Sequence, residues 1–194
     1  MKSGDPSEAC VMRSYSGLAA HAERRDGRAF DRSMFISELD VTDPSTAAAV
    51  RDVGRRAYAV EAELIGFAGI PALAETVEEM QAQPLNWLGM VTSRGRIAAF
   101  IAWRPLEGED GMDIDRLCVD PEFFRRGVAR TLLGHLVTGL SPGGTALVST
   151  GADNRPAISL YERLGFVRVG TVRRAPGLLM AEFRLVRGPS RGRT

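Results

Sequence analysis

An arginine-rich turn before a predicted helix is the part of this sequence best suited to chemistry. The turn contains Arg125, Arg126 and Gly127, and the helix is predicted over 127–140. Backbone N–H groups in the first turn of a helix have no partner inside it, and the helix dipole attracts negative charge there. Gly127 lets the backbone approach a ligand closely. The turn is therefore a candidate pyrophosphate site, although a glycine among solvated arginines explains the spacing equally well.

A second polar segment lies downstream, where Asn154 is expected to open a helix over 155–164. Tyr161 lies within this helix, and Gly165 ends it before a strand that begins at Phe166. A tyrosine hydroxyl can donate a proton to a leaving group. An aromatic residue at this position also fits the buried face of a helix, so the residues alone leave both interpretations open.

Together the two segments resemble the signatures of the GNAT superfamily of acyl-CoA N-acyltransferases. The phosphate-binding signature of that family, Gln/Arg-x-x-Gly-x-Gly/Ala, ends here on Gly127 and Ala129, with Phe124 in place of its Gln or Arg. The later signature, Asn-x-x-Ala-x-x-x-Tyr-x-x-x-Gly-Phe, is complete: Asn154, Ala157, Tyr161, Gly165 and Phe166. The resemblance covers residues 34–186 and is tightest over 112–170.

The resemblance implies acetyl-CoA as co-substrate, with its diphosphate at the arginine-rich turn. It assigns the following residues to the phosphates: Phe124, Arg125, Arg126, Gly127, Val128, Ala129 and Arg130. It places the main chain of three strand residues against the pantetheine arm and the thioester carbonyl: Leu117, Cys118 and Val119. Three residues of the second signature complete the cofactor site: Asn154, Ala157 and Tyr161. The side chain of Asn154 is expected to bind pantetheine, to cap the helix, or both.

A break in alternation within the strand predicted over 112–120 indicates a β-bulge. Apolar and acidic residues alternate from Met112 to Asp115, yet Arg116 stands where the next apolar residue is expected, and apolar positions resume at Leu117. One extra residue near this point produces such a shift, as does a poorly patterned strand end. In the GNAT superfamily a bulge here splays two parallel strands and admits the pantetheine arm.

The reaction that the resemblance implies is direct attack of a neutral amine on a thioester. It needs a proton acceptor for the amine and a proton donor for the departing thiolate. Tyr161 is the expected donor, Asp113 the first choice of acceptor and Asp115 the second, acting through water. Carboxylates at a strand edge are usually only solvated, so Glu38 or a chain of waters stays open as the acceptor. Some relatives have a glutamate at the position of Ser149.

Hydrophobic periodicity and turn residues predict the elements that must position these groups. The predicted strands and helices are strands over 35–41, 86–92, 96–103, 112–120, 145–150, 166–172 and 178–186, and helices over 44–64, 71–82, 127–140 and 155–164. They predict an α/β (α+β) fold: a GNAT-like, mixed, mostly antiparallel central sheet with a splayed pair of parallel strands and helices on both faces. We expect a flexible leader over 1–33, the GNAT domain over 34–187 and a frayed tail over 188–194.

Composition argues against several other classes. The formal net charge is +1, and without a basic helix stripe it does not favour nucleic acid. Two cysteines and two histidines give no disulfide framework or metal-site spacing, so no metal is expected. No apolar run is long enough to cross a bilayer and no signal peptide is evident. The expectation is a cytoplasmic protein without a membrane partner.

The leading hypothesis is an N-acetyltransferase acting on a primary amine of a small molecule or peptide. The acceptor would be held by the segment 58–86 and by the last two strands. Glutamates in that segment, Glu61 among them, favour a cationic acceptor or form an ordinary solvated helix face. The alternative, motivated by Phe124 and the unassigned proton acceptor, is a catalytically silent acyl-CoA-binding sensor or scaffold. The identity of the acceptor is open, and so is the oligomeric state, a homodimer included.

Overall fold

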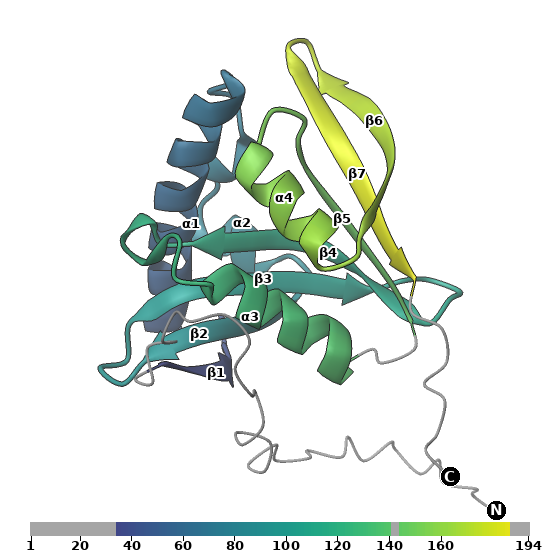
Figure 1. Cartoon of the computed structure of the whole chain (residues 1–194). Helices are drawn as coiled ribbons and strands as arrows, with labels where there is room; N and C mark the ends of the chain where they lie inside the picture. The colour runs from purple at the N-terminus through teal and green to yellow at the C-terminus, as the bar shows by residue number, and fades with distance from the viewer. Residues whose placement is uncertain (1–33, 141–143, 187–194) are drawn as a thin grey trace, which may run out of the picture.

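A single mixed sheet organises the molecule. The computed structural model describes residues 34–140 and 144–186, so the expectations for 1–33 and 188–194 lie outside it. Within these ranges seven strands lie in the order β1-β2-β3-β4-β5-β7-β6 (Figure 1). They are β1 (Met34–Glu38), β2 (Asn86–Thr92), β3 (Ile97–Pro105), β4 (Gly111–Val119), β5 (Thr145–Gly151), β6 (Val167–Ala175) and β7 (Leu178–Val186). Every described pair of neighbours is antiparallel except β4 and β5, which confirms the predicted fold class.

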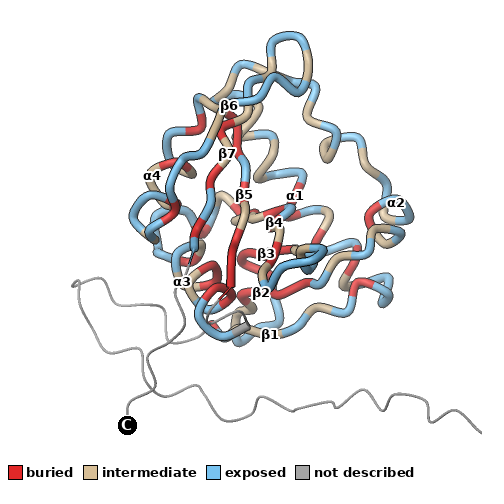
Figure 2. Tube along the Cα trace, turned by 90° about the vertical axis from the view of Figure 1, so that its right-hand side faces the viewer, coloured by how far each residue is buried: buried red, intermediate tan, exposed pale blue. Residues whose placement is uncertain are grey.

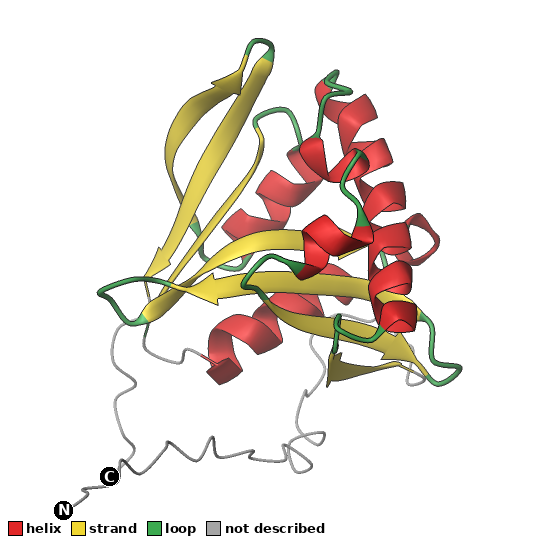
Figure 3. Cartoon of the chain, turned by 180° about the vertical axis from the view of Figure 1, so that it is seen from behind, coloured by secondary structure: helices red, strands yellow, loops and turns green. Residues whose placement is uncertain are grey.

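Helices cover both faces of the sheet. Those described are α1 (Pro44–Ile65), α2 (Val77–Gln81), α3 (Val128–His135) and α4 (Arg155–Arg163), with 3₁₀ turns at Pro71–Leu73 and Pro121–Phe123 and a π-helical turn at Leu136–Leu140. α1 and α2 lie on one face, and α3 and α4 on the other (Figures 1 and 3). None of these helices is both long and apolar enough to cross a membrane.

Two hydrophobic clusters hold the helices to the sheet. The cluster beneath α3 and α4 includes Leu132, Leu133 and Phe183, and the cluster beneath α1 includes Val50 and Phe100. All five side chains are almost fully buried, and burying each contributes roughly 1.5–3 kcal/mol. Figure 2 shows the buried positions along the central strands, whereas β6, at the sheet edge, is largely exposed.

The parallel pair separates after a short ladder. β4 and β5 are paired from Gly111 with Thr145 to Ile114 with Val148. Beyond these residues β4 pairs with β3 alone, and β5 with β7 alone. The two parts of the sheet therefore diverge as the arms of a V (Figures 1 and 3). This confirms the predicted splay.

A bulge in β4 lies at the predicted position. Ala102 of β3 is opposite Arg116 and Trp103 is opposite Ile114, so Asp115 is the extra residue. The bulge changes which face each later residue occupies. Leu117 packs on the cluster beneath α3 and α4, as Ile114 does, whereas Arg116 lies over the ring of Trp87 in the cluster beneath α1.

One predicted helix is wrong as a continuous element. The segment 71–82 forms the 3₁₀ turn at Pro71–Leu73 and then, separately, α2. The helix restarts because the Thr76 hydroxyl accepts from the Glu79 N–H while the Glu79 carboxylate accepts from the Thr76 N–H, which is a capping box. β1 also ends earlier than predicted, at Glu38.

Candidate active site

The gap between the arms of the V is bounded on one side by the end of β4. From Asp115 to Val119 this strand has no pairing with β5 in the described ladder, so its main chain on that side is available to a ligand. Leu117 and Val119 are half-buried, and Cys118 is buried on the α1 face. The side chain of Cys118 thus points away from the helices α3 and α4, while its main chain lies at the gap.

The arginine-rich turn connects β4 to α3 and is open to solvent. Arg125 and Gly127 both adopt positive φ, 61° and 78°, which bends the chain sharply before the first turn of α3. Phe124 is 41% exposed, and a Cβ at Gly127 would meet no atom within 4 Å. Open space therefore lies next to the N–H groups that begin α3, the arrangement that an anion requires.

The other members of the predicted phosphate site differ in exposure. Arg126 and Arg130 are exposed, and the guanidinium of Arg126 lies over the Phe123 ring, 5.3 Å from its centroid. Ala129 is half-buried, but Val128 is only 1% exposed. Val128 can therefore reach a ligand through its N–H and not through its side chain.

Asp120 anchors this turn to the rest of the fold. Its side chain is 2% exposed and accepts from Arg56 at 2.8 Å, from Arg96 at 3.4 Å and from the N–H of Glu122 at 3.1 Å. Burial alone would raise the pKa of Asp120, but these hydrogen bonds and the two cations outweigh it, so the pKa lies below its ordinary value. The end of β4 is thereby fixed to α1 and to the β2–β3 turn.

α1 bridges the gap near its C-terminus. Glu61 Oε1 accepts from Thr150 Oγ1 at 3.1 Å, from the Gly151 N–H at 3.4 Å and from Asn154 Nδ2 at 3.0 Å. A Cβ at Gly151 would lie 2.6 Å from Ile65 Cγ2. The absence of a side chain at Gly151 therefore lets the last turns of α1 approach the end of β5.

Tyr161 of α4 is 4% exposed and packs between the rings of Phe166 and Phe183, with centroids 5.7 and 5.5 Å away. Burial raises the pKa of Tyr161 well above its ordinary value, and the charge of Glu61 and the nearby Cys118 raise it further. Tyr161 therefore keeps its proton at neutral pH.

Asn154 caps α4, as one of the two interpretations predicted. Its Oδ1 accepts from the N–H of Ala157 at 3.2 Å, and its amide nitrogen donates to Glu61. Ala157 is half-buried against the cluster beneath α3 and α4. Asn154 of the second signature thus starts α4 and also joins α4 to α1 through a hydrogen bond.

A profile of the Acetyltransferase (GNAT) family matches residues 28–166, more than half of the sequence. The chain belongs to the GNAT acetyltransferase family. The geometry fits this membership, since the resemblance implied both the gap in the sheet and an open turn before α3.

Individual relatives are similar over parts of the chain. YqkA of Bacillus subtilis, a UPF0157 protein, is 37% identical over 129 residues, 66% of this chain and 37% of YqkA. The [ribosomal protein bS18]-alanine N-acetyltransferase of Escherichia coli K12 is 37% identical over 86 residues, 43% of this chain and 56% of that enzyme. The chain thus spans between 37% and 56% of the length of these two curated relatives.

Solved structures share the fold. The crystal structure of the E. coli ribosomal-protein-S18-alanine N-acetyltransferase has a TM-score of 0.62 at 25% identity, covering 81% of this chain and 96% of that one. An aminoglycoside 6'-N-acetyltransferase complexed with coenzyme A has a TM-score of 0.62 at 18% identity, covering 81% of this chain and 99% of that one.

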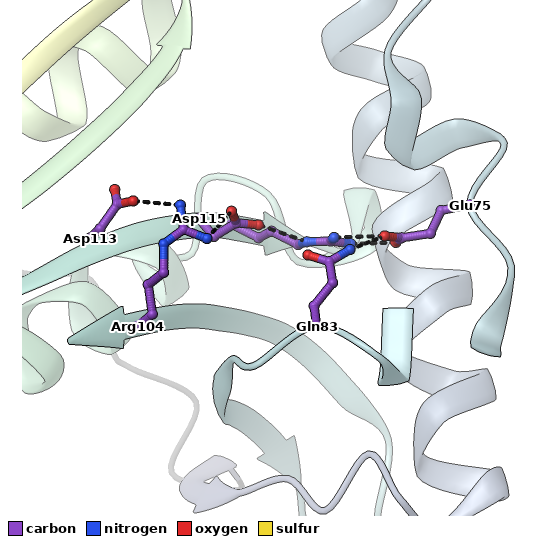
Figure 4. A network of polar contacts seen from close by, with 6 residues as sticks. Glu75, Gln83, Arg104, Asp113 and Asp115 are labelled. Atoms are coloured by element: carbon purple, nitrogen blue, oxygen red, sulfur yellow. Dashed lines mark hydrogen bonds and ion pairs between the residues drawn. The ribbon is translucent and has the colours of Figure 1, made fainter. Parts of the chain in front are cut away.

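The two aspartates chosen as proton acceptors are paired with arginines in this GNAT domain. Arg104 Nη2 lies 2.6 Å from Asp113 Oδ2 and Arg104 Nη1 lies 3.5 Å from Asp115 Oδ1, while Arg116 Nε lies 3.1 Å from Asp115 Oδ2. Arg116 continues the row to Glu75 (Figure 4). The row of charges runs along the α1 face of β4, where it fixes the bulge and the segment before α2.

Sequence reasoning did not place Glu61 in the gap of this GNAT domain. The available signal was helical spacing, because Tyr58, Glu61 and Ile65 recur at intervals of three and four along α1 and so share one face. Tyr58 lies beside Cys118, and burial raises the pKa of both groups, that of Cys118 to about 12. Glu61 therefore shares this side of the gap with two buried groups whose raised pKa values keep them protonated at neutral pH.

Proposed function

We propose that this chain is an N-acetyltransferase that transfers the acetyl group of acetyl-CoA to a primary amine of a small molecule or peptide. Transfer occurs by direct attack within a ternary complex. One observation carries the proposal: β4 and β5 part after Ile114 and Val148, with the open turn at Gly127 after the end of β4 and the buried hydroxyl of Tyr161 on α4. A thioester lying in this gap has a phosphate site at one end and a proton donor at the other.

The residues around the gap suit acetyl-CoA. The first N–H groups of α3, with Arg125, Arg126 and Arg130, would hold the diphosphate. The main chain of β4 from Leu117 to Val119 would pair with the pantetheine arm and donate to the thioester carbonyl oxygen, where negative charge grows during attack. When bound, acetyl-CoA supplies the activated acetyl group.

Tyr161 is proposed as the general acid. The amine nitrogen forms a bond to the thioester carbonyl carbon, the C–S bond breaks, and the sulfur leaves as a thiolate. Because burial keeps Tyr161 protonated, its hydroxyl can supply the proton that turns the thiolate into a thiol. In the described residues no hydrogen bond engages this hydroxyl, so its proton is not committed to another acceptor.

A peptide amino group is the first acceptor to test. The relative named as a ribosomal protein bS18-alanine N-acetyltransferase is 37% identical over 86 residues, and its name gives an alanine as the acetylated residue. The partly buried Glu61 lies beside the gap, where it accepts hydrogen bonds from the end of β5 and from Asn154. A carboxylate there suits an acceptor that arrives as a cation.

The experiment combines binding and turnover. Calorimetry measures acetyl-CoA binding to the full chain, and thiol release is then followed with an alanyl tripeptide, putrescine and kanamycin as acceptors. Binding together with amine-dependent thiol release supports the proposal. Binding without release from any acceptor would favour the silent acyl-CoA-binding module. No heat of binding, on material with a cooperative unfolding transition, would overturn both functions.

A further inference from the structure

We propose that Glu61 is the proton acceptor for the incoming amine, supplied to the gap from α1 and not from the sheet. This rests on the proposed function and deepens it. Glu61 lies one turn before the end of α1, and its carboxylate accepts hydrogen bonds from the end of β5 and from Asn154 at the start of α4. It therefore stands at the edge of the gap opposite β4, among the groups that would surround the thioester.

The carboxylate is fixed through one oxygen. Oε1 receives all three hydrogen bonds, from Thr150, Gly151 and Asn154. Among the described residues Oε2 has no hydrogen-bond donor, and no arginine pairs with Glu61 within the same ranges. One oxygen thus orients the group while the other is available to accept a proton, which is the geometry that a general base needs.

The other candidate acceptors are less well placed. Asp113 and Asp115 are both ion-paired with Arg104, and Ser149 has no carboxylate. Glu38 ends β1, an edge strand that is separated from β5 by β2, β3 and β4. Three strand spacings separate β1 from β4, or about 14 Å at roughly 4.8 Å each. Glu61 is therefore the carboxylate that the fold brings to the gap.

The titratable groups facing Glu61 are neutral at pH 7. They are Tyr58 on α1, Cys118 on β4 and Tyr161 on α4, and burial raises the pKa of each. The charge of Glu61 raises these pKa values further. Arg116 is a cation close to Tyr58 and Cys118, and its guanidinium bonds Glu75 and Asp115. Glu61 thus places a carboxyl group beside the hydroxyl of Tyr161, a pair suited to opposite proton transfers.

The proposed step balances. The amine lone pair forms the N–C bond, the C–S bond breaks with its electrons going to sulfur, the amine proton goes to Glu61 and the Tyr161 proton goes to the sulfur. Exchange with water then returns a proton to Tyr161 and removes one from Glu61. The sum is an amine plus a thioester giving an amide plus a thiol.

Glu61→Gln tests the step, with Asp52→Asn as the control, because Asp52 is an exposed carboxylate of the same helix outside the segment 58–86. The glutamine oxygen can still accept from Asn154, but the side chain cannot take a proton. With the best acceptor of the panel at pH 7, we expect kcat to fall about a hundredfold, with the Kd of CoA within twofold of the unmodified chain. The deficit should shrink as the pH rises to 10, because hydroxide can then take the amine proton in place of Glu61. Asp52→Asn should match the unmodified chain at every pH.

Each outcome decides the matter. An unchanged kcat in Glu61→Gln, or a deficit that is the same at every pH and accompanied by weaker CoA binding, would overturn the role of Glu61 while leaving the proposed function intact. If Glu61→Gln does not fold, Glu61→Asp carries the test, since the shorter carboxylate should lower kcat and leave CoA affinity unchanged. Absence of transfer by the unmodified chain would overturn the proposed function and, with it, this role.

Discussion

Arg116 of β4 and Glu75, just before α2, form a two-pronged ion pair across 41 positions of sequence. Arg116 Nη2 lies 2.8 Å from Glu75 Oε1, and Nη1 bonds Oε2. Both side chains are largely buried, 9% and 13% exposed. Burial alone would lower the pKa of Arg116, but its bonds to Glu75 and Asp115 raise it above the ordinary value. The pair holds the segment before α2 against the bulge.

Removing Arg116 should therefore lower the free energy of unfolding more than removing an arginine at the surface does. We expect Arg116→Met to lower the free energy of unfolding by about 3 kcal/mol, because Glu75 is left partly buried without its partner. Glu75→Gln in the same chain should restore part of the loss. Arg104→Met is the control, since Arg104 is 47% exposed and surface pairs contribute about 0–1 kcal/mol. Equal losses in urea denaturation for the two arginine variants would contradict the prediction.

Tyr161→Phe should separate chemistry from binding. The ring still packs on Phe166 and Phe183, so the fold and the affinity for CoA should change little. Loss of the hydroxyl removes the proposed proton donor, and kcat should fall by about a hundredfold or more. Steady-state thiol release and calorimetry measure the two effects. A variant with the kcat of the unmodified chain would remove Tyr161 from the mechanism.

Gly127→Ala should weaken binding of the diphosphate. Gly127 has φ of 78°, where a Cβ costs about 1–2 kcal/mol, and relief of that strain would turn the N–H groups of α3 away from the ligand. A comparable loss of binding energy is about tenfold in Kd for CoA. Acetyl-pantetheine lacks the diphosphate, so the variant and the unmodified chain should use it as a substrate with the same kcat/KM. Gly95→Ala, at φ of 77° in the β2–β3 turn, is the control, and an equal loss of CoA affinity there would count against the prediction.

Asp120→Asn should change the pH dependence of stability. The pKa of Asp120 is lower in the folded chain than its ordinary value. The ionised side chain therefore contributes fully to the free energy of unfolding above its pKa in the unfolded chain. This contribution is lost as the pH falls through its pKa in the folded chain. At pH 7 we expect the variant to lose about 2 kcal/mol of unfolding free energy, and the difference should narrow below about pH 4. Urea denaturation at pH 7 and pH 3 measures both. A constant difference would contradict the assignment, and the exposed Asp52→Asn should show neither effect.

Local patterns in the sequence predicted much of the fold. Asp43 and Pro44 mark the start of α1, and the Asp43 side chain does accept from the Thr46 N–H. The shift of apolar residues around Arg116 predicted the bulge that Asp115 forms. The capping box from Thr76 to Glu79 is also a local pattern, and it marks a helix start inside the segment 71–82 that periodicity alone predicts as one helix.

Long-range partners could not be predicted in the same way. The bonds from Glu61 to Thr150, Gly151 and Asn154 join residues about ninety positions apart, and no periodicity within α1 encodes them. They follow from packing, because Gly151 admits Ile65 and thereby brings α1 to β5. The arginine partners of Asp113 and Asp115 likewise depend on the register of β3 against β4.

The shortness of the ladder between β4 and β5 has a consequence for cooperativity. Four residue pairs join the antiparallel unit of β1 to β4 with that of β5 to β7, so in the described residues this corner offers the fewest backbone bonds to break. Partial unfolding should begin there, with β5, β7, β6 and α4 detaching as one body. Asn154 and Tyr161 belong to that body and Cys118 to the other. The residues of the proposed site therefore come together only while the two units are docked.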